Sequence, residues 1–200
     1  MGRHPIIPDF HAWKLLCYLE SCPNVSQRGA ARVLGINVKI CHEVVTRLVS
    51  KGWIHIHKHN ARRWDYILTQ DGLREKARLT VEFLDFSMQF YRQARESSAT
   101  LCQSLASQGE AHVSLLGTNG LSEITAISLQ EADLQIAKIY DAAPTDEQTF
   151  LNHPVHPIEA ITYDNGPPII VCLYEPSSPM AHRYLPPTAP RSRRYHWIFA

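Results

Sequence analysis

The segment NVSQRGAARVLGINVKICHEVVTRLVSKG, residues 24–52, predicts two short helices separated by a glycine turn. Asn24 or Ser26 can accept hydrogen bonds from the first free amides of one helix, which Gly35 ends. Asn37 can cap the other helix, which continues to the next glycine. Apolar residues recur there at the spacing of one buried face, which consists of Cys41, Val44 or Val45, and Leu48. The opposite face carries Lys39, His42, Glu43, Thr46, Arg47 and Ser50.

The flanking sequence extends this pair into a larger motif. Residues 11–22 predict a helix that Pro23 ends, with Trp13, Leu15, Leu16 and Leu19 facing inward. Residues 53–68 alternate apolar and polar side chains on either side of a polar tip at residues 60–63, which predicts a β-hairpin. Three helices followed by a hairpin with a basic tip predict a winged helix-turn-helix, a fold that places one helix in the major groove of double-stranded DNA.

The predicted DNA contacts follow from this geometry. The third helix would read base edges and the wing would meet phosphates, while the start of the second helix would touch the backbone. The residues concerned are Ser26, Gln27, Arg28, Asn37, Lys39, His42, Thr46, Arg47, Arg62 and Arg63. His55, His57 and His59 would share one face of a strand, a spacing able to hold zinc. They have no acidic or cysteine partner nearby in the sequence, so phosphate proximity or solvation is favoured and no metal site is expected.

Charge is distributed unevenly along the 200 residues, which are enough for one large or two small domains. Residues 1–63 carry ten Lys and Arg against three Asp and Glu, a net of +7, whereas residues 111–200 carry five against nine, a net of −4. This asymmetry suggests an anionic partner for the front end only. The five cysteines form no CxxC pair, and neither a signal peptide nor a membrane span is evident, so a cytoplasmic protein with reduced thiols is expected.

A specific resemblance appears in residues 64–93, WDYILTQDGLREKARLTVEFLDFSMQFYRQ. Together with residues 24–38 and 49–54, this segment resembles the MarR-type winged-helix regulators associated with bacterial exopolysaccharide gene clusters. Relatives carry a YxLTxxGxxEKARLTxxFL run, represented here by Tyr66, Leu68, Thr69, Gly72, residues 75–80, Phe83 and Leu84. The resemblance covers residues 11–95 and implies sequence-specific DNA binding by a dimer.

Residues 70–107 predict one long helix, since no proline occurs there and no glycine after Gly72. Positions spaced alternately by four and three form a heptad row: 73, 77, 80, 84, 87, 91, 94, 98, 101 and 105. This row fits close packing of two helices in a homodimer, and an intramolecular spacer helix is the alternative. Gln108 and Gly109 mark the expected end of the helix.

The back half alternates strand and helix patterns, which predicts a small Rossmann-like parallel α/β domain over residues 110–185. GTNGLSEI, residues 117–124, approximates G-x-G-x-x-G/A with Gly117, Asn119 and Ser122, and with Gly120 as an extra glycine. Asp141 lies 24 residues after Gly117, near the offset of a ribose-binding acid. A nucleotide or dinucleotide could therefore contact Gly117, Asn119, Gly120 and Asp141, although Asn119 crowds the position where backbone approaches pyrophosphate.

These patterns predict an α/β protein with a winged helix-turn-helix over residues 1–69 and a connecting helix over 70–109. A Rossmann-like domain and a tail over 186–200 follow. The HPVHP segment, residues 153–157, suits a rigid loop, and the tail either is flexible or docks Tyr195, Trp197, Ile198 and Phe199 on a partner subunit or domain.

The expected function is a homodimeric DNA-binding regulator, with possible modulation by a small-molecule effector. The alternative is a nucleotide- or cofactor-binding sensor or enzyme whose winged helix contacts protein; no catalytic motif favours an enzyme.

Overall fold

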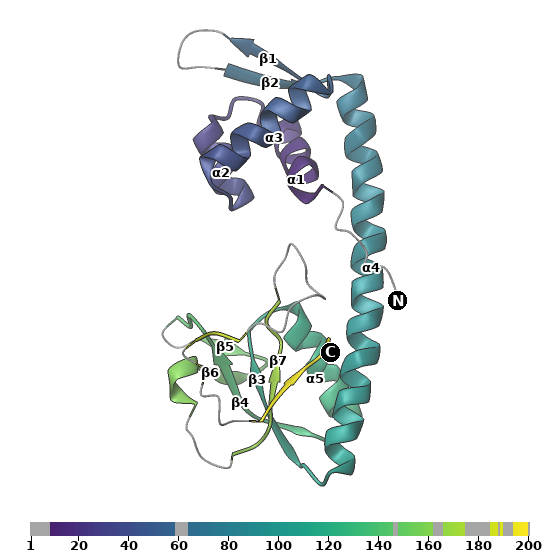
Figure 1. Cartoon of the computed structure of the whole chain (residues 1–200), viewed down its shortest axis with the longest axis vertical. Coiled ribbons are helices and arrows are strands. Elements are labelled where there is room, and N and C mark those ends of the chain that lie inside the picture. The colour runs from purple at the N-terminus through teal and green to yellow at the C-terminus, as the bar shows by residue number, and fades with distance from the viewer. Residues whose placement is uncertain are drawn as a thin grey trace. The chain divides into compact units, whose positions relative to one another are not determined.

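The structure is a computed structural model that describes residues 9–58, 64–145, 148–161, 166–174, 185–187, 189 and 194–199. Contacts divide the chain into two compact units, one ending at Ser87 and the other beginning at Met88. The 38-residue helix α4 (Gln70–Ser107) contributes to both units (Figure 1). Its bounds are those expected from the sequence, whereas the four-part division at residues 69, 109 and 185 stays a prediction. Among the described residues no helix is both long and apolar enough to cross a membrane.

The N-terminal unit is a winged helix-turn-helix, as the sequence predicts. Helices α1 (Phe10–Ser21), α2 (Gln27–Leu34) and α3 (Val38–Ser50) precede an antiparallel hairpin of β1 (Ile54–Lys58) and β2 (Trp64–Leu68) (Figure 1). Side chains of Asp9, Ser26 and Asn37 cap the three helices in turn. Gly35 ends α2 with a φ of 71°, a left-handed conformation that glycine adopts without steric cost.

The core of this unit lies between the three helices and the hairpin. It includes Leu15, Leu16 and Leu19 of α1 and all four expected positions of α3, Cys41, Val44, Val45 and Leu48. Trp13 packs against this core, as expected, and it also reaches α4. It is only half-buried, its indole N–H donates to Thr80 Oγ1 at 2.9 Å, and its ring stacks on Phe83 of α4 with centroids 4.3 Å apart. Trp13 therefore joins α1 to α4.

The turn between the hairpin and α4 is the most tightly constrained point of the unit. The Thr69 hydroxyl donates to the carbonyl of Gly52 at 2.7 Å and accepts from the amide of Gly72 at 3.0 Å. The Thr69 amide donates to the carbonyl of Trp53 at 3.1 Å. A Cβ on Gly72 would lie 2.0 Å from that same carbonyl oxygen, so only glycine fits. The Leu-Thr-x-x-Gly pattern, residues 68–72, therefore fixes the first turn of α4 against Gly52 and Trp53, which follow α3.

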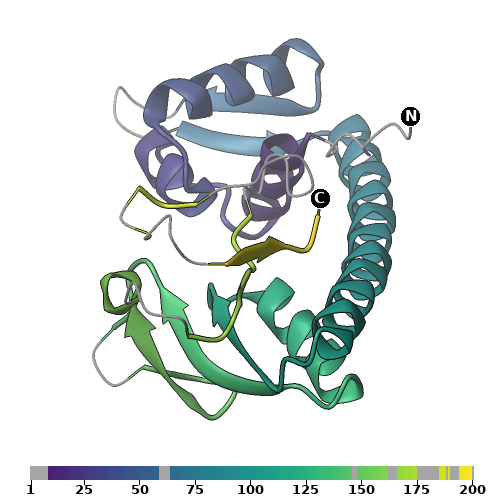
Figure 2. The same ribbon diagram turned by 60° about the horizontal axis from the view of Figure 1, so that its bottom comes forward.

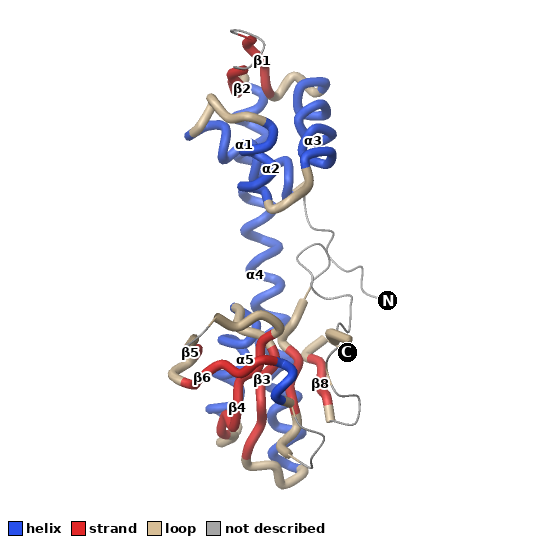
Figure 3. Tube along the Cα trace, turned by 90° about the vertical axis from the view of Figure 1, so that its left-hand side faces the viewer, coloured by secondary structure: helices blue, strands red, loops and turns tan. Residues whose placement is uncertain are grey.

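The C-terminal unit is a six-stranded sheet with the order β5-β6-β4-β3-β7-β8. Its strands are β3 (His112–Leu116), β4 (Gln135–Asp141), β5 (Thr149–Phe150), β6 (His153–Pro157), β7 (Ile169–Val171) and β8 (Tyr195–Trp197). All neighbouring pairs are parallel except β5 with β6. Counted along the chain, the five parallel strands have the order 3-2-1-4-5, which is that of the doubly wound dinucleotide-binding fold. The predicted parallel α/β architecture is confirmed (Figure 3).

Apolar residues pack on both faces of this sheet. Helix α5 (Gly120–Glu131) and the second half of α4 cover one face, where Ala94, Cys102 and Leu105 meet side chains of α5 and the central strands (Figure 2). The 3-10 helix η1 (Ile158–Ala160) covers part of the other face, with Ile158 packed among Leu116, Tyr140 and Ile169. Burial on both faces explains why β3 reads as a continuous apolar run rather than an alternating one.

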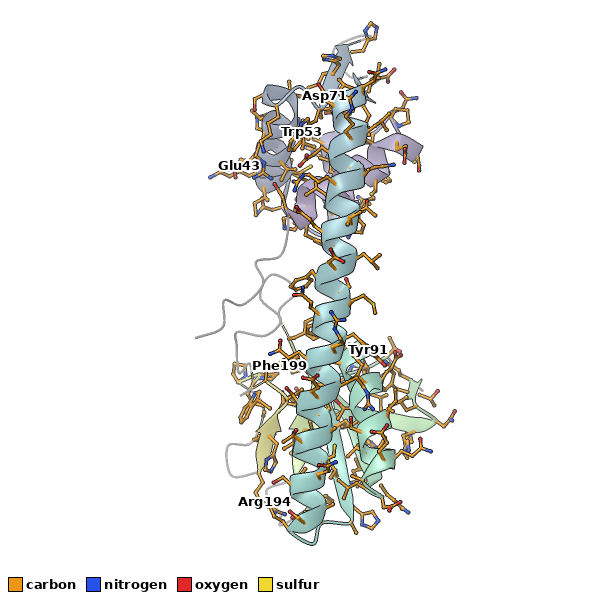
Figure 4. All side chains as sticks on the ribbon, turned by 90° about the vertical axis from the view of Figure 1, so that its right-hand side faces the viewer. Glu43, Trp53, Asp71, Tyr91, Arg194 and Phe199 are labelled. Atoms are coloured by element: carbon orange, nitrogen blue, oxygen red, sulfur yellow. The ribbon has the colours of Figure 1, made fainter. Side chains whose placement is uncertain are left out.

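Two segments differ from the sequence prediction. HPVHP is strand β6 rather than a rigid loop, with Val155 opposite Ile139 of β4. Its prolines are tolerated because Pro154 precedes the first residue paired with β4, Val155, and Pro157 is the last residue of the strand. The C-terminal aromatic segment forms β8 beside β7, with Ile198 buried and the Phe199 ring 5.6 Å from that of Phe90 on α4. This segment therefore docks on its own domain (Figure 4).

The expected heptad row of α4 divides into two parts. Ala94, Ser98 and Leu105 are buried inside the C-terminal unit, so these positions pack within the chain. The preceding turns present apolar side chains that are each at least 43% exposed: Leu73, Val81, Leu84, Met88 and Tyr91. Of these, Leu73, Leu84 and Tyr91 belong to the expected row, whereas Val81 and Met88 lie one residue after its positions 80 and 87. The part of the row that remains free for a second chain therefore lies before Arg95.

We expect Gly72→Ala to lower the free energy of unfolding of the N-terminal unit by about 3 kcal/mol or more, because the new methyl overlaps a backbone oxygen. Urea unfolding followed by tryptophan fluorescence measures this change. Gly120→Ala is the control, since nothing lies within 4 Å of its added Cβ and its stability should be unchanged or slightly raised. Equal stability of both variants would contradict the proposed constraint at Gly72.

Candidate nucleic-acid interface

Helix α3 presents its polar residues on the side opposite the core. Lys39, His42, Glu43, Thr46, Arg47 and Ser50 are all exposed, as the helical spacing predicts. Glu43 projects from the outer edge of the unit in Figure 4. Val38 and Ile40 in the first turn are also exposed, at 43% and 39%. A single helix with a polar outer face and an apolar first turn can offer both hydrogen-bonding and methyl contacts to base edges.

Several predicted DNA-binding residues also have structural roles. Ser26 Oγ accepts from the Gly29 amide at 3.1 Å, and Asn37 Oδ1 accepts from the Ile40 amide at 2.8 Å. These bonds use the acceptor atoms that cap α2 and α3. His42 Nδ1 and Gln27 Oε1 lie 3.3 Å apart, so the start of α2 is tied to the outer face of α3. Lys39, Thr46 and Arg28 are exposed and form no side-chain hydrogen bond or ion pair with another described residue.

Arg47 is held by a residue that the sequence analysis missed. Its guanidinium forms an ion pair with the Asp9 carboxylate, whose other oxygen accepts from the Ala12 amide as the cap of α1. Both ends of the ion pair remain partly exposed, at 45% and 36%. Asp9 thus fixes α1 and the end of α3 together. An aspartate immediately before a predicted helix is a common cap signal and could have identified it.

A second missed contact lies beside the hairpin. The Lys51 ammonium sits over the Trp53 ring, 4.3 Å from its centroid, at the end of α3. His55 and His57 are exposed on one face of β1, as expected. The wing tip with Arg62 and Arg63, and also His59, lie outside the described residues. In the described ranges no three His, Cys, Asp or Glu side chains are grouped as a metal site.

The loop after β3 is the predicted nucleotide site, and it lies at the carboxyl ends of β3 and β7, where the strand order reverses. Gly117 is buried with a φ of +116°, and a Cβ there would lie 3.1 Å from Leu173 Cδ2. This position therefore needs glycine. The amide of Gly117 donates to the Tyr140 carbonyl, and its own carbonyl accepts from Ser122 Oγ at 2.6 Å.

The polar groups of this loop bond to one another. Asn119 Oδ1 accepts from the amides of Leu121 and Ser122 at 2.9 and 3.4 Å, and Asn119 Nδ2 donates to the Cys172 carbonyl at 3.0 Å. Thr118 Oγ1 donates to Asp141 Oδ2 at 2.5 Å. The amides that a phosphate would bind and the carboxylate that a ribose would bind thus have internal partners. Nucleotide binding at Gly117, Asn119, Gly120 and Asp141 stays a prediction. Binding there would require the ligand to replace these internal hydrogen bonds.

All five cysteines are free thiols. Burial raises the pKa of Cys102 to about 12 and that of Cys172 to about 11. Burial also raises the pKa of Cys41 and Cys17. A thiol must lose its proton to act as a nucleophile or a metal ligand, so these side chains favour packing over reactivity near neutral pH.

Comparison with known proteins gives partial similarity to solved structures. No protein-family model matches the chain, and no curated protein matches it. One similar structure is the PcaV transcriptional regulator from Streptomyces coelicolor, 28% identical over 40% of this chain and 60% of that chain, with a TM-score of 0.37. Another is MepR, a transcription regulator of the Staphylococcus aureus multidrug efflux pump MepA, 20% identical over 49% of this chain and 78% of that chain, with a TM-score of 0.35.

A third similar structure is TrmBL2, an archaeal chromatin protein. It is 10% identical, covers 67% of this chain and 62% of that chain, and has a TM-score of 0.29. The chain thus spans less than two thirds of the length of PcaV and of TrmBL2.

We expect Asn119→Ala to speed hydrogen exchange of the Leu121 amide by about fivefold, because the loss of one helix cap removes about 1 kcal/mol of local protection. Exchange followed by NMR measures this rate. Asn119→Asp keeps an oxygen for the cap and loses the amide that donates to Cys172, so it should retain most of the protection. Exchange of Leu121 at the wild-type rate in the alanine variant would show that Asn119 does not close the loop.

Proposed function

We propose that this protein is a DNA-binding transcriptional regulator that works as a homodimer. The observation that carries the proposal is the outer face of α3, which presents Lys39, His42 and Thr46 opposite a core formed by every inward position of the helix. A helix of this width fits the major groove when its neighbours hold its ends on the DNA backbone. The resemblance to MarR-type regulators of exopolysaccharide gene clusters points to the same class.

Contacts around α3 would position it on the duplex. Arg28 lies in the first turn of α2, beside the cap residue Ser26, where free amides and a positive side chain can meet phosphate. Asn37 and Gln27 retain amide N–H donors beyond the acceptor atoms that they use internally. Arg62 and Arg63 of the wing tip would contact phosphates, and Arg47 would have to exchange Asp9 for DNA before it could read a base.

The homodimer would form through the exposed apolar row of α4, residues 73–91. From Val81 to Tyr91 the exposed side chains recur at spacings of three and four, which lets two helices pack along their length, and Leu73 lies eight residues before Val81. In Figure 4, Tyr91 and Phe199 lie on opposite sides of α4, so the Tyr91 end of the row lies away from the contact of Phe90 with Phe199. Two winged helices linked in this way would read two half-sites at a fixed separation.

The C-terminal domain would transmit a signal from an effector or a protein partner. Its strand order reverses between β3 and β7, which is the place at which doubly wound folds bind ligands, and the loop at Gly117 lies there. The alternative function is a nucleotide- or cofactor-binding sensor or enzyme whose winged helix contacts protein, and that same strand order is the observation in its favour. Asn119 and Asp141 are hydrogen-bonded within the domain, which favours a regulatory role for the domain over a catalytic one.

Replacing both wing arginines, Arg62→Ala with Arg63→Ala, should weaken binding to every duplex by a similar factor. Each lost phosphate contact removes about 0.9 from the slope of log affinity against log salt, so the slope should fall by about 2. Fluorescence anisotropy titrations at several salt concentrations measure this slope. A double variant whose salt slope equals that of the wild type would contradict the role of the wing.

The matched control removes two exposed positive charges from the other unit, Arg92→Ala with Lys138→Ala. It should leave the salt slope near that of the wild type. The alternative function is tested by the same titrations on genomic fragments: wild-type protein that prefers no sequence at moderate salt would contradict the regulator proposal.

For the dimer, we expect Leu84→Glu to weaken self-association at least about tenfold, because a charge buried between two helices costs more than the 1.4 kcal/mol that tenfold represents. Sedimentation equilibrium measures the dissociation constant. Ile127→Glu is the control, since Ile127 is 44% exposed on α5, away from the row. A Leu84→Glu variant with wild-type self-association would exclude this face of α4 as the interface.

A further inference from the structure

Glu43 occupies the middle of the outer face of α3. Lys39 precedes it by one turn, Thr46 and Ser50 follow at the same helical spacing, and all are exposed. The buried residues Cys41, Val44, Val45 and Leu48 lie on the opposite side. If α3 enters the major groove, Glu43 enters it at the level of the bases rather than at the phosphates.

Glu43 is also the one acidic residue of the basic front end that lacks an ionic partner in the described part of the chain. Residues 1–63 contain three acidic residues. Asp9 forms an ion pair with Arg47, and Glu20 forms one with Lys76 at 2.6 Å. Neither Lys39 nor Arg47, one turn away on each side of Glu43, is bonded to it in the described residues, and Arg47 is drawn to Asp9 instead.

An unpaired carboxylate on this face has a definite cost in a DNA complex. It lies in the negative potential of the groove, so it weakens attraction to every duplex alike. This loss of affinity is offset only where a base offers a hydrogen-bond donor to the carboxylate. In the major groove, cytosine and adenine offer amino donors, whereas the guanine edge and the thymine edge present acceptors. The adenine amino group lies beside the N7 acceptor, which repels a carboxylate, so the donor that suits a lone carboxylate is the 4-amino group of cytosine.

Resting on the proposed DNA-binding function, we propose that Glu43 is a specificity-determining residue of α3. Its carboxylate accepts a hydrogen bond from the 4-amino group of a cytosine at one position of each half-site. Guanine and thymine at that position are rejected because their acceptor oxygens would face the carboxylate. The internal pair of Asp9 with Arg47 supports this role, because it keeps the nearest guanidinium from neutralising Glu43.

The test is selection of binding sites from a randomised duplex pool by the full-length wild type, Glu43→Gln and Glu43→Ala. The wild type should enrich a motif with cytosine at one position, preferred on the order of tenfold over the other bases. Glu43→Gln should shift that position to adenine, because a carboxamide can both accept from N6 and donate to N7. Glu43→Ala should lose preference there and keep the rest of the motif.

Glu96→Gln is the charge-matched control, since Glu96 is exposed on α4 in the C-terminal unit. It should select the wild-type motif. A motif that is unchanged in Glu43→Ala, or changed at a position that is not cytosine, overturns this inference while leaving the regulator proposal intact. Wild-type protein that enriches no sequence overturns both.

Discussion

The close approach of Gly72 to the Trp53 carbonyl is the constraint on which the N-terminal unit depends. The carbonyl sits two residues after the cap of α3, and the Trp53 amide bonds back to Leu48 in the buried face of that helix. Thr69, which lies between β2 and α4, adds hydrogen bonds to both Gly52 and Trp53. The end of α3, the base of the hairpin and the first turn of α4 therefore form one rigid corner. Backbone atoms of Gly52, Trp53 and Gly72 make these contacts.

Polar side chains around α3 are divided between building the unit and facing outward. Ser26 and Asn37 use their oxygens as caps, Gln27 holds His42, and Asp9 holds Arg47. Lys39, Glu43 and Thr46 are left exposed without such bonds. In this division the caps fix the helix ends, and a few side chains remain available for contacts with the proposed partner. It also shows why a list of exposed polar residues overstates the number of groups that are free to read DNA.

Much of this fold follows from local sequence signals. Caps at Ser26 and Asn37, the left-handed Gly35 and the uninterrupted helix from Gln70 to Ser107 were all predictable because each depends on a few adjacent residues. Strand β6 and strand β8 were not, because HPVHP and YHW are extended only through pairing with β4 and β7, which are distant in the sequence. The heptad row of α4 gave the correct period but could not show that Ala94 and Ser98 are covered by α5 and the sheet. Likewise, the glycine loop was recognisable, whereas the bonds of Asn119 and Asp141 that fill it depend on tertiary neighbours.

The central claim is that α3 is the surface that meets DNA. Hydrogen–deuterium exchange of the full chain, with and without a genomic duplex selected by binding, tests it most directly. The account predicts added protection over residues 26–29 and 37–50, and little direct change in the strands of the C-terminal sheet. Protection confined to the C-terminal unit, or none at all on a duplex that is shown to be bound, would contradict it.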